Sequence, residues 1–335
     1  MTLTSRGASA PDPSVYDSRT MPGEFDFIDW IRSQSRADPR IIVPIGDDLA
    51  AMKWDANDLL LVGADQVLDG VHFDSAVHAP RDIGRKAMNR NLSDCAAMAC
   101  LPAAAVATVA LPKGTAIEYA KELFLGMSEA GEKFNCPIIG GDTSSWKGKL
   151  ALSVSILGKT TIGPVRRNGA RPGDHLHVTG PLGGSLLGRH MTFEPRISFA
   201  WMMMQMVRGP YRVADLNITA MIDLSDGLSR DIRHICAQSS VGAIIFSDKI
   251  PVHDDAVEMR RDGHSPLEHA LHDGEDYELL LTMAGMPTEQ AARPTTTGEA
   301  SLNWIGTITA EPGIFLQHSD GRREPLEPKA WEHQF

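Results

Sequence analysis

The sequence predicts a two-domain chain with an α/β first half and an α+β second half. Three observations support this fold class. The chain has 335 residues, more than a single hydrophobic core usually accommodates. Apolar runs typical of strands alternate with amphipathic segments typical of helices in both halves. A stretch rich in glycine, proline and arginine, "TTIGPVRRNGARPGD", separates the two halves.

The first half has the predicted order β-α-β-α-β-β. We expect a buried strand in "DLLLVGAD" and a long helix in "PRDIGRKAMNRNLSDCAAMAC", with Pro80 near its start and Pro102 after its end. A strand in "AAAVATVAL" and an amphipathic helix in "GTAIEYAKELFLGMSEAGEKF" follow. The last two strands are "CPIIGGD", which runs into a glycine turn, and "LALSVSILGK". We place the boundary near Lys159, which gives a loose tail over 1–22 and domains over 23–159 and 160–335.

The second half alternates again. It begins with a strand in "HLHVTG", a turn and helix in "PLGGSLLGRHM", and a Met-rich helix in "EPRISFAWMMMQMVRG" that is typical of core packing. A strand, an acidic turn and a helix follow in "ITAMIDLSDGLSRDIRHICAQS". Further strands are expected in "GAIIFS", "DYELLLTM" and "SLNWIGTITA".

Composition and charge exclude several kinds of partner. The formal net charge of -11 disfavours binding to nucleic acids or anionic membranes. The longest apolar segment, Ala96 to Ala110, is broken by Pro102 and is too short to span a bilayer. The N-terminus has no apolar leader segment, and the four cysteines form no C-x-x-C pair. We therefore expect a cytoplasmic protein with reduced thiols, and no nucleic-acid or membrane partner.

Six aspartates stand beside apolar segments. One lies in the long helix, and the others follow strands, end strands or flank a strand-to-helix turn: Asp48, Asp65, Asp94, Asp142, Asp223 and Asp226. Any one of them alone is more readily explained as a turn former or a helix cap. Strand ends and helix starts converge on one rim of an α/β sheet, however, where ligands usually bind. Together the six favour several Mg²⁺ ions that hold a polyphosphate.

Phosphate-binding loops of the usual kinds are missing. The segment "GGDTSSWKGK" has the wrong glycine spacing for a Walker A loop, and no G-x-G-x-x-G follows the first strand. The turn in "TGPLGGSLLG" fits either a phosphate site at a helix N-terminus or a tight turn without a ligand. We therefore expect metal ions to hold the phosphates, with help from basic residues such as Arg167.

A series of motifs resembles one known family. "GEF", "IGDDLA", "DGVHF", "NLSDCAAM", "GGDT", "NGARPGD", "IDLSDGL" and "GEDYELL" occur in this order. Together they resemble the thiamine-monophosphate kinases of the aminoimidazole-ribonucleotide-synthetase-like superfamily, from Gly23 to the C-terminus. The resemblance implies an N-terminal α/β domain of that superfamily's type, which dimerises, and a C-terminal α+β domain, with ATP between them.

The resemblance also implies an activity and a site. The activity is transfer of the γ-phosphoryl group of ATP to thiamine monophosphate, which gives thiamine diphosphate. The implied Mg²⁺ ligands are the six aspartates named above. The implied ATP contacts are Gly141, Arg167 and Ser225, and the implied thiamine-phosphate contacts are His72, Glu275 and Trp331. A catalytic base is unnecessary because the acceptor is a phosphate oxygen that is already ionised at neutral pH.

One departure from the family pattern bears on the metal sites. The family usually has Ser/Thr-Thr-Asp where this chain reads Gly63-Ala64-Asp65, so two hydroxyl groups are lost beside one predicted ligand. The number of Mg²⁺ ions therefore stays open.

Other functions remain as alternatives. A hydrogenase maturation factor would need a C-terminal cysteine, but the chain ends "WEHQF". A selenophosphate synthetase would need a reactive residue near the N-terminus, and no cysteine precedes Cys95. A nucleotide-binding regulator without turnover is compatible with the change at Gly63-Ala64. A two-metal phosphohydrolase is disfavoured because the sequence lacks His-Asp metal pairs.

Overall fold

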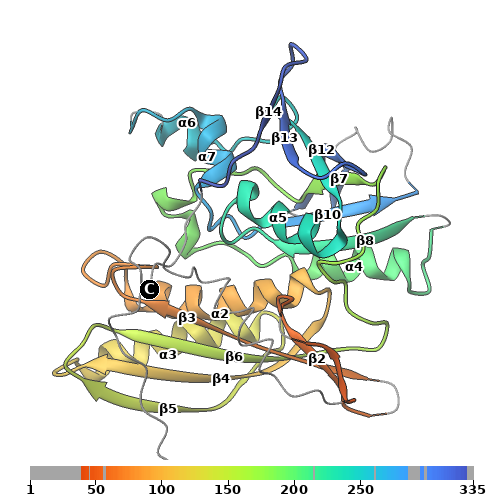
Figure 1. Ribbon diagram of the computed structural model, residues 1–335. Coiled ribbons are helices and arrows are strands. Elements are labelled where there is room, and N and C mark those ends of the chain that lie inside the picture. Colours follow the sequence, from red (N-terminus) through yellow and green to blue (C-terminus); the bar gives the residue numbers. More distant parts are fainter. Residues whose placement is uncertain are drawn as a thin grey trace, which may run out of the picture. The chain divides into compact units, whose positions relative to one another are not determined.

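Two β-sheets with helices packed against them form the described part of this computed structural model (Figure 1). The structure describes residues 39–329 except 45, 56–57, 214–215, 260–261, 286–294 and 298–299, and of 295–297 the backbone only. The predicted tail over 1–22 and the predicted substrate contact Trp331 lie outside these residues. None of the described helices is long and apolar enough to cross a membrane.

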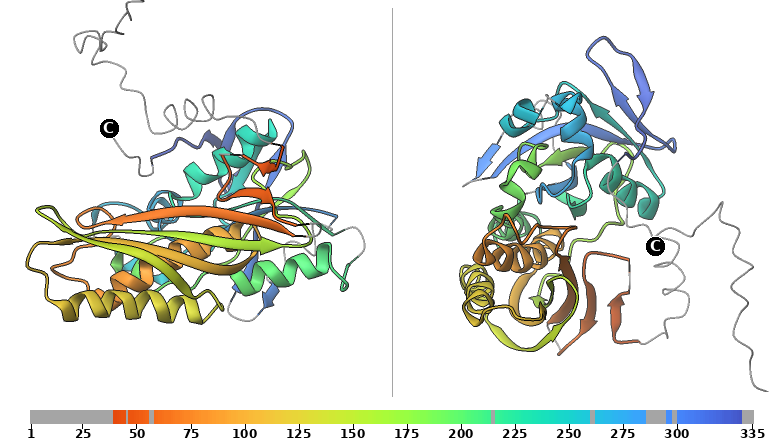
Figure 2. Two further views of the ribbon diagram at one scale, coloured as in Figure 1. Left: turned by 90° about the horizontal axis from the view of Figure 1, so that it is seen from below. Right: turned by 90° about the vertical axis from the view of Figure 1, so that its left-hand side faces the viewer.

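The first sheet has six strands in the order β1-β2-β3-β6-β4-β5. Only β4 and β5 run parallel to each other. The strands are β1 (Ile41–Val43), β2 (Ala50–Lys53), β3 (Leu59–Leu68), β4 (Leu101–Pro112), β5 (Ile138–Trp146) and β6 (Ala151–Thr160). Helices α2 (Pro80–Ala97) and α3 (Ile117–Glu132) lie along one face of this sheet (Figure 2). The predicted order β-α-β-α-β-β is confirmed by β3-α2-β4-α3-β5-β6.

The second sheet follows the order β14-β13-β9-β12-β7-β10-β8, and β11 pairs with β12. Its strands are β7 (His175–Val178), β8 (Asn217–Asp223), β9 (Gly242–Phe246), β10 (Leu279–Ala284), β11 (Thr295–Thr297), β12 (Ala300–Thr309), β13 (Ile314–Gln317) and β14 (Arg323–Pro325). Its helices are α4 (Ile197–Val207), α5 (Leu228–Ser239), α6 (Asp254–Met259) and α7 (Pro266–His272). The predicted boundary near Lys159 lies at the end of β6 and stays a prediction.

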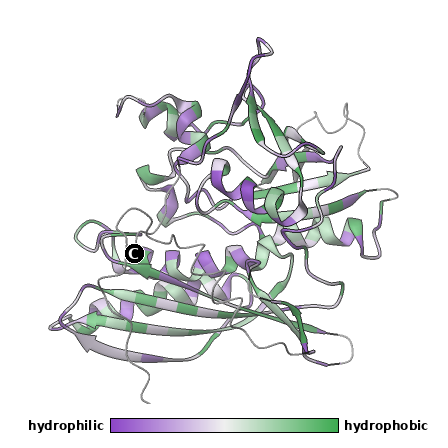
Figure 3. Ribbon diagram, viewed as in Figure 1, coloured by the Kyte–Doolittle hydropathy of each residue, from purple (hydrophilic) through white to green (hydrophobic). Residues whose placement is uncertain are grey.

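Helix α2 is polar in sequence yet mostly buried. Figure 3 shows hydrophilic and hydrophobic residues interleaved along it. Its buried positions include Lys86, Asn89, Asn91 and Ser93. Buried polar groups are costly unless they are paired, so this helix is the first place to look for a functional site.

One hydrophobic core runs from the first sheet through α2 into one face of the second sheet. Leu279 and Leu281 of β10 belong to this core, whereas Leu280 between them belongs to a second core beside α5. This alternation is the period of two expected of a strand that is covered on both faces. The position of α2 relative to β8 and β10 is therefore fixed by packing.

Three local expectations were wrong. The strand predicted to stop at a glycine turn continues as β5 through Trp146, because its pairing with β4 is unbroken there, and Asp142 lies within it opposite Thr108. Asp65 likewise lies inside β3, paired with Val154 of β6, and does not end the strand. The helix expected in "PLGGSLLGRHM" is replaced by two single 3₁₀ turns, Ser185–Leu187 and Arg189–Met191, which Gly188 separates.

Two glycines allow α2 and α3 to pack closely. A Cβ atom on Gly84 would overlap the backbone carbonyl of Leu123, and one on Gly126 would overlap the carbonyl of Arg81. Backbone atoms cannot move aside as a flexible side chain can. The close approach of the two helices therefore requires glycine at both positions.

We expect Gly84→Val to lower the free energy of unfolding by about 2 kcal/mol or more, because overpacked sites cost about 1–3 kcal/mol. Urea unfolding measures the change. Gly140→Val is the matched control, since a Cβ atom there meets nothing within 4 Å. Equal unfolding midpoints for the two variants would contradict this expectation, because they would show that α2 and α3 can move apart at little cost in free energy.

Candidate active site

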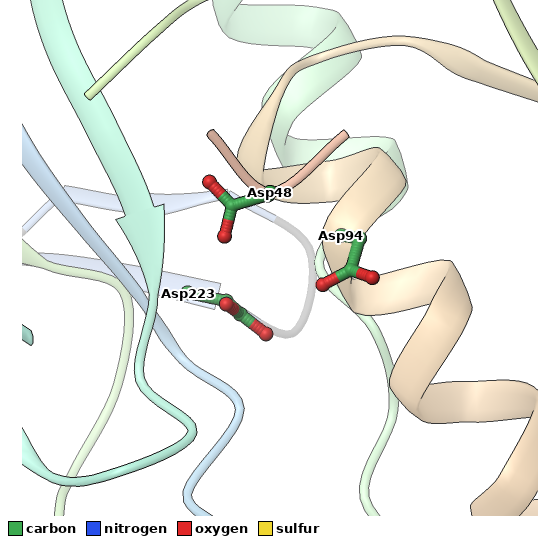
Figure 4. A group of neighbouring side chains, drawn as sticks. All are labelled: Asp48, Asp94 and Asp223. Atoms are coloured by element: carbon green, nitrogen blue, oxygen red, sulfur yellow. The ribbon is translucent and has the colours of Figure 1, made fainter. Parts of the chain in front are cut away.

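Three carboxylates meet where the two sheets and α2 come together (Figure 4). Asp48 lies in the loop before β2, Asp94 in the last turn of α2, and Asp223 at the end of β8. One oxygen from each lies within 4.8 Å of the others. Within the described ranges, no other group of three or more His, Cys, Asp or Glu residues meets this distance. The arrangement offers hard oxygen ligands converging on one point, as divalent cations prefer.

The three carboxylates repel one another in a site with little water. Burial raises the pKa of Asp94 well above its usual value, and the neighbouring charges of Asp65, Asp223 and Asp48 raise it further. Burial and the charge of Asp48 raise the pKa of Asp223 to about 8, although the Ser93 hydroxyl donates a hydrogen bond of 2.6 Å to its Oδ2. A cation between the three groups would relieve this repulsion.

The adjacent acids Asp47 and Asp48 are each paired with arginine. Nε and Nη2 of Arg167 donate to the two oxygens of Asp48, at 3.1 and 2.9 Å. The backbone N–H of Arg167 donates to Asp47 at 2.7 Å, and Nε of Arg166 lies 3.6 Å from the other oxygen of Asp47. The bidentate contact fixes Asp48 in orientation as well as charge. It also places Arg167, a predicted ATP contact, at the edge of the carboxylate group.

A buried lysine joins two of the predicted substrate contacts. Lys86 is 0% exposed, and its Nζ donates to the backbone carbonyl of His72 and to Oε2 of Glu275, at 2.6 Å each. Glu275 in turn donates its N–H to the carbonyl of Ser225 at 2.7 Å. The predicted substrate residues His72 and Glu275 and the predicted ATP residue Ser225 are thus connected by hydrogen bonds, although they are far apart in sequence.

A second cation lies one turn further along α2. Arg90 donates from Nε to Oδ2 of Asp65 at 3.0 Å, and its Nη1 lies 3.7 Å from Oε1 of Glu275. The side-chain oxygen of Asn91 accepts the backbone N–H of Asp65 at 3.2 Å. Asp65 is therefore held by two residues of α2 at the edge of the site.

The remaining predicted ligands lie elsewhere. The N–H groups of Asp226 and Gly227 both donate to the buried carboxylate of Asp231 at 3.1 Å, which fixes the turn that carries Asp226. Asp142 and Gly141 line a separate cavity of about 390 Å³ over β4, β5 and α3. The structure therefore brings together three of the six predicted metal ligands. It places Asp65 beside Arg90 and leaves Asp226 and Asp142 outside the group.

Sequence reasoning overlooked several residues of this site: Asp47, Lys86, Arg90, Asn91, Ser93, Arg166 and Asp231. One signal was available for some of them. Lys86, Arg90 and Asp94 recur every four residues in the long helix, a spacing that aligns side chains on one helical face. Charged residues on the same helical face as the predicted ligand Asp94 indicate a buried ion-pair network.

Comparison with known proteins identifies the family of this chain. The family model for the N-terminal domain of AIR synthase related proteins matches residues 46–160, and the model for the C-terminal domain matches 171–319. Thiamine-monophosphate kinase of Rhodopirellula baltica is 39% identical over 318 residues, which cover 92% of this chain and 97% of the relative. The chain belongs to the thiamine-monophosphate kinase family. The prediction of a kinase is thereby confirmed.

Solved structures agree with membership of the thiamine-monophosphate kinase family. The structure described as "AaThiL complexed with AMPPCP and TMP" is 30% identical with a TM-score of 0.78, over 95% of this chain and all 100% of that one. Escherichia coli HypE, a hydrogenase maturation protein, has a TM-score of 0.64 over 91% of this chain and 98% of its own, at 18% identity. The second likeness shows the fold alone. The predicted fold class, with two domains of this superfamily, is confirmed.

We expect Asp94→Asn to abolish kinase turnover while the protein stays folded. The amide keeps the shape of the side chain but removes a charge that would bind a cation. Since the three carboxylates repel one another, the thermal midpoint without metal should be equal or higher. Turnover and thermal unfolding are measured side by side.

The control for this variant is Asp82→Asn in the first turn of the same helix, which should keep activity within a factor of about two because surface substitutions cost within about 0.5 kcal/mol. Full activity of Asp94→Asn would remove Asp94 from the site.

Lys86 gives the site a pH dependence. Burial lowers its pKa to about 8, against about 10.4 in an unfolded chain. Between these values the unfolded chain holds more protons, so the contribution of Lys86 to stability rises with pH. Loss of the proton removes the charge that holds Glu275. We therefore expect the KM of the acceptor substrate to rise as the pH passes 8, even though stability does not fall.

The variant Lys86→Met tests this assignment in steady-state kinetics over pH 6.5–9.5. Its KM should be raised at every pH and should lose the rise near pH 8. If the rise persists in Lys86→Met, another group is responsible for it.

Proposed function

We propose that the chain transfers the γ-phosphoryl group of ATP to thiamine monophosphate, with formation of thiamine diphosphate. The observation that carries this proposal is the convergence of Asp48, Asp94 and Asp223. The complex with AMPPCP and TMP, whose fold this chain shares over 95% of its length, supports the choice of the two substrates. Membership of the kinase family supports the direction of the reaction.

The three carboxylates fit Mg²⁺. They are hard oxygen donors from three different elements, and their mutual repulsion, which raises the pKa values of Asp94 and Asp223, would be relieved by a cation between them. Asp48, Asp94 and Asp223 would hold the ion, and Asp142 and Asp226 stay predicted as further ligands. The chemistry that Mg²⁺ supplies at such a site is neutralisation and alignment of phosphate oxygens.

The chain itself positions the reactants for an in-line transfer. The acceptor oxygen of a phosphate monoester is ionised at neutral pH, so the protein need not remove a proton. Arg167, held against Asp48, presents a fixed positive charge at the edge of the site. Lys86 fixes Glu275 and the backbone of His72 relative to each other. Rate enhancement then comes from orientation and electrostatics.

We assign ATP to Arg167 and Ser225, and thiamine monophosphate to His72, Glu275 and Trp331. Gly141, which lines the separate cavity over β4, β5 and α3, stays an ATP contact predicted from the family pattern. The hydrogen bond between Ser225 and Glu275 supports neighbouring sites for the two substrates. The carboxylate of Glu275, which Lys86 and Arg90 hold in place, suits the cationic end of thiamine. The assignment of Trp331 rests on the family pattern.

The proposal includes a homodimer in the cytoplasm. Strand β5 is an edge strand of the first sheet, and Ile139 and Trp146 on it are 64% and 50% exposed. An exposed apolar edge strand invites pairing with a second copy. The four cysteines, all buried and free, fit a reducing compartment.

Incubation with Mg-ATP and either thiamine monophosphate or free thiamine, followed by chromatography, tests the reaction. We expect thiamine diphosphate from the monophosphate and no phosphorylation of free thiamine. A hydroxyl acceptor would have to lose a proton, and none of the interactions described above places a base for it. Equal turnover of both acceptors would contradict the proposal.

The same assay separates the alternatives. A nucleotide-binding regulator, which the missing hydroxyls at Gly63-Ala64 would favour, should bind ATP without forming ADP. A phosphohydrolase should form ADP and phosphate whether or not thiamine monophosphate is present.

A further inference from the structure

The carboxylate of Asp65 is already occupied by a cation of the chain itself. Arg90 donates from Nε to Oδ2 of Asp65 at 3.0 Å, and the arginine side chain is only 14% exposed. Its Nη1 is 3.7 Å from a Glu275 oxygen, so the guanidinium lies between two acids. An arginine guanidinium stays protonated at every physiological pH, so Arg90 is a permanent positive charge.

Several side-chain oxygens that could assist Asp65 as a metal ligand are absent or already engaged. The two preceding residues, Gly63 and Ala64, carry no oxygen in their side chains. The amide oxygen of Asn91 already accepts the backbone N–H of Asp65. Within the described chain, the one group of three or more such residues whose ligand atoms lie within 4.8 Å of one another is Asp48, Asp94 and Asp223, and Asp65 is not a member of it.

The space beside Gly63 is filled with hydrocarbon. A Cβ atom on Gly63 would overlap Cδ2 of Leu49, and Leu49 is 1% exposed. A serine or threonine at this position would have to displace a fully buried leucine. The side chain of Leu49 therefore fills the space that a hydroxyl-bearing side chain at position 63 would need.

We infer that the guanidinium of Arg90 replaces a metal ion at Asp65, so that Asp65 is the partner of a resident cation and no metal ligand. This inference rests on the metal site proposed above. The site then has two kinds of positive charge. One is an exchangeable ion on Asp48, Asp94 and Asp223, and the other is a fixed guanidinium on Asp65 and Glu275.

Counting bound metal ions tests the inference without measuring activity. The probe is Mn²⁺ alone, and the free ion is titrated by electron paramagnetic resonance against the full-length chain. We expect Asp94→Asn to lose at least one bound ion and Asp65→Asn to keep the wild-type number and affinity. Arg90→Gln frees the carboxylate of Asp65, so it should bind one more ion or bind Mn²⁺ about tenfold more tightly, since a nearby like charge has been removed.

Two further variants keep the result interpretable. Arg90→Lys retains the charge and should bind Mn²⁺ as the wild type does, which separates charge from any loss of packing. Arg85→Gln is the matched control on the same helix, because Arg85 pairs with the exposed Asp82 and should leave Mn²⁺ binding unchanged.

The outcomes are distinct. Loss of an ion in Asp65→Asn, or weaker binding in Arg90→Gln, would show that Asp65 holds metal and would overturn the inference while the metal site stands. Unchanged Mn²⁺ binding in Asp94→Asn would instead overturn the metal site, and the inference with it.

Discussion

Mutual repulsion among the buried carboxylates of Asp48, Asp94 and Asp223 is the constraint on which the site depends. Three acids whose oxygens lie within 4.8 Å of one another cannot all be ionised unless positive charge is nearby. Arg167 provides part of that charge and donates two hydrogen bonds to the carboxylate of Asp48. A divalent cation bound to phosphate would supply the rest of the positive charge that the three carboxylates need. The pair of adjacent aspartates in "IGDD" is tolerable because each acid has its own arginine.

Helix α2 holds the site together because it lies in the core shared by both sheets. It carries Asp94, and on the same face Lys86 and Arg90, each of which binds an acid from another element. Gly84 lets α3 pack against the back of the helix, so that α2 cannot shift without disturbing backbone contacts. Helix α2 can therefore hold charged side chains in fixed positions although its sequence is polar. One side of it packs against α3, and the other side forms the ion pairs of Lys86 and Arg90.

The sequence predicts the elements well and their contacts poorly. The alternation over 59–160 follows from local patterns, so all six elements there were predictable. The extended course of β5 was not, since two glycines before Asp142 read as a turn and only pairing with β4 keeps the chain straight. The contact between Lys86 and Glu275 joins residues 189 positions apart, and no local pattern encodes it. The convergence of Asp48, Asp94 and Asp223 was foreseen from their sequence contexts and the family pattern. Arg167 was foreseen as a phosphate contact, but its ion pair with Asp48 was not.

The two cations differ in kind because the acids they face differ in arrangement. Asp223 is 4% exposed and one of three converging carboxylates, a concentration of charge that suits a small divalent ion with several oxygen ligands. The side chain of Asp65 is 31% exposed and is not a member of the group of three, and the side chain of Leu49 fills the space where a Cβ atom on Gly63 would lie. A planar guanidinium satisfies a single carboxylate with directed hydrogen bonds and needs no further ligands. The packing of Leu49 against Gly63 and the ion pair of Arg90 with Asp65 point in the same direction, since the first leaves no room for a hydroxyl group at position 63 and the second supplies the acid with a positive charge.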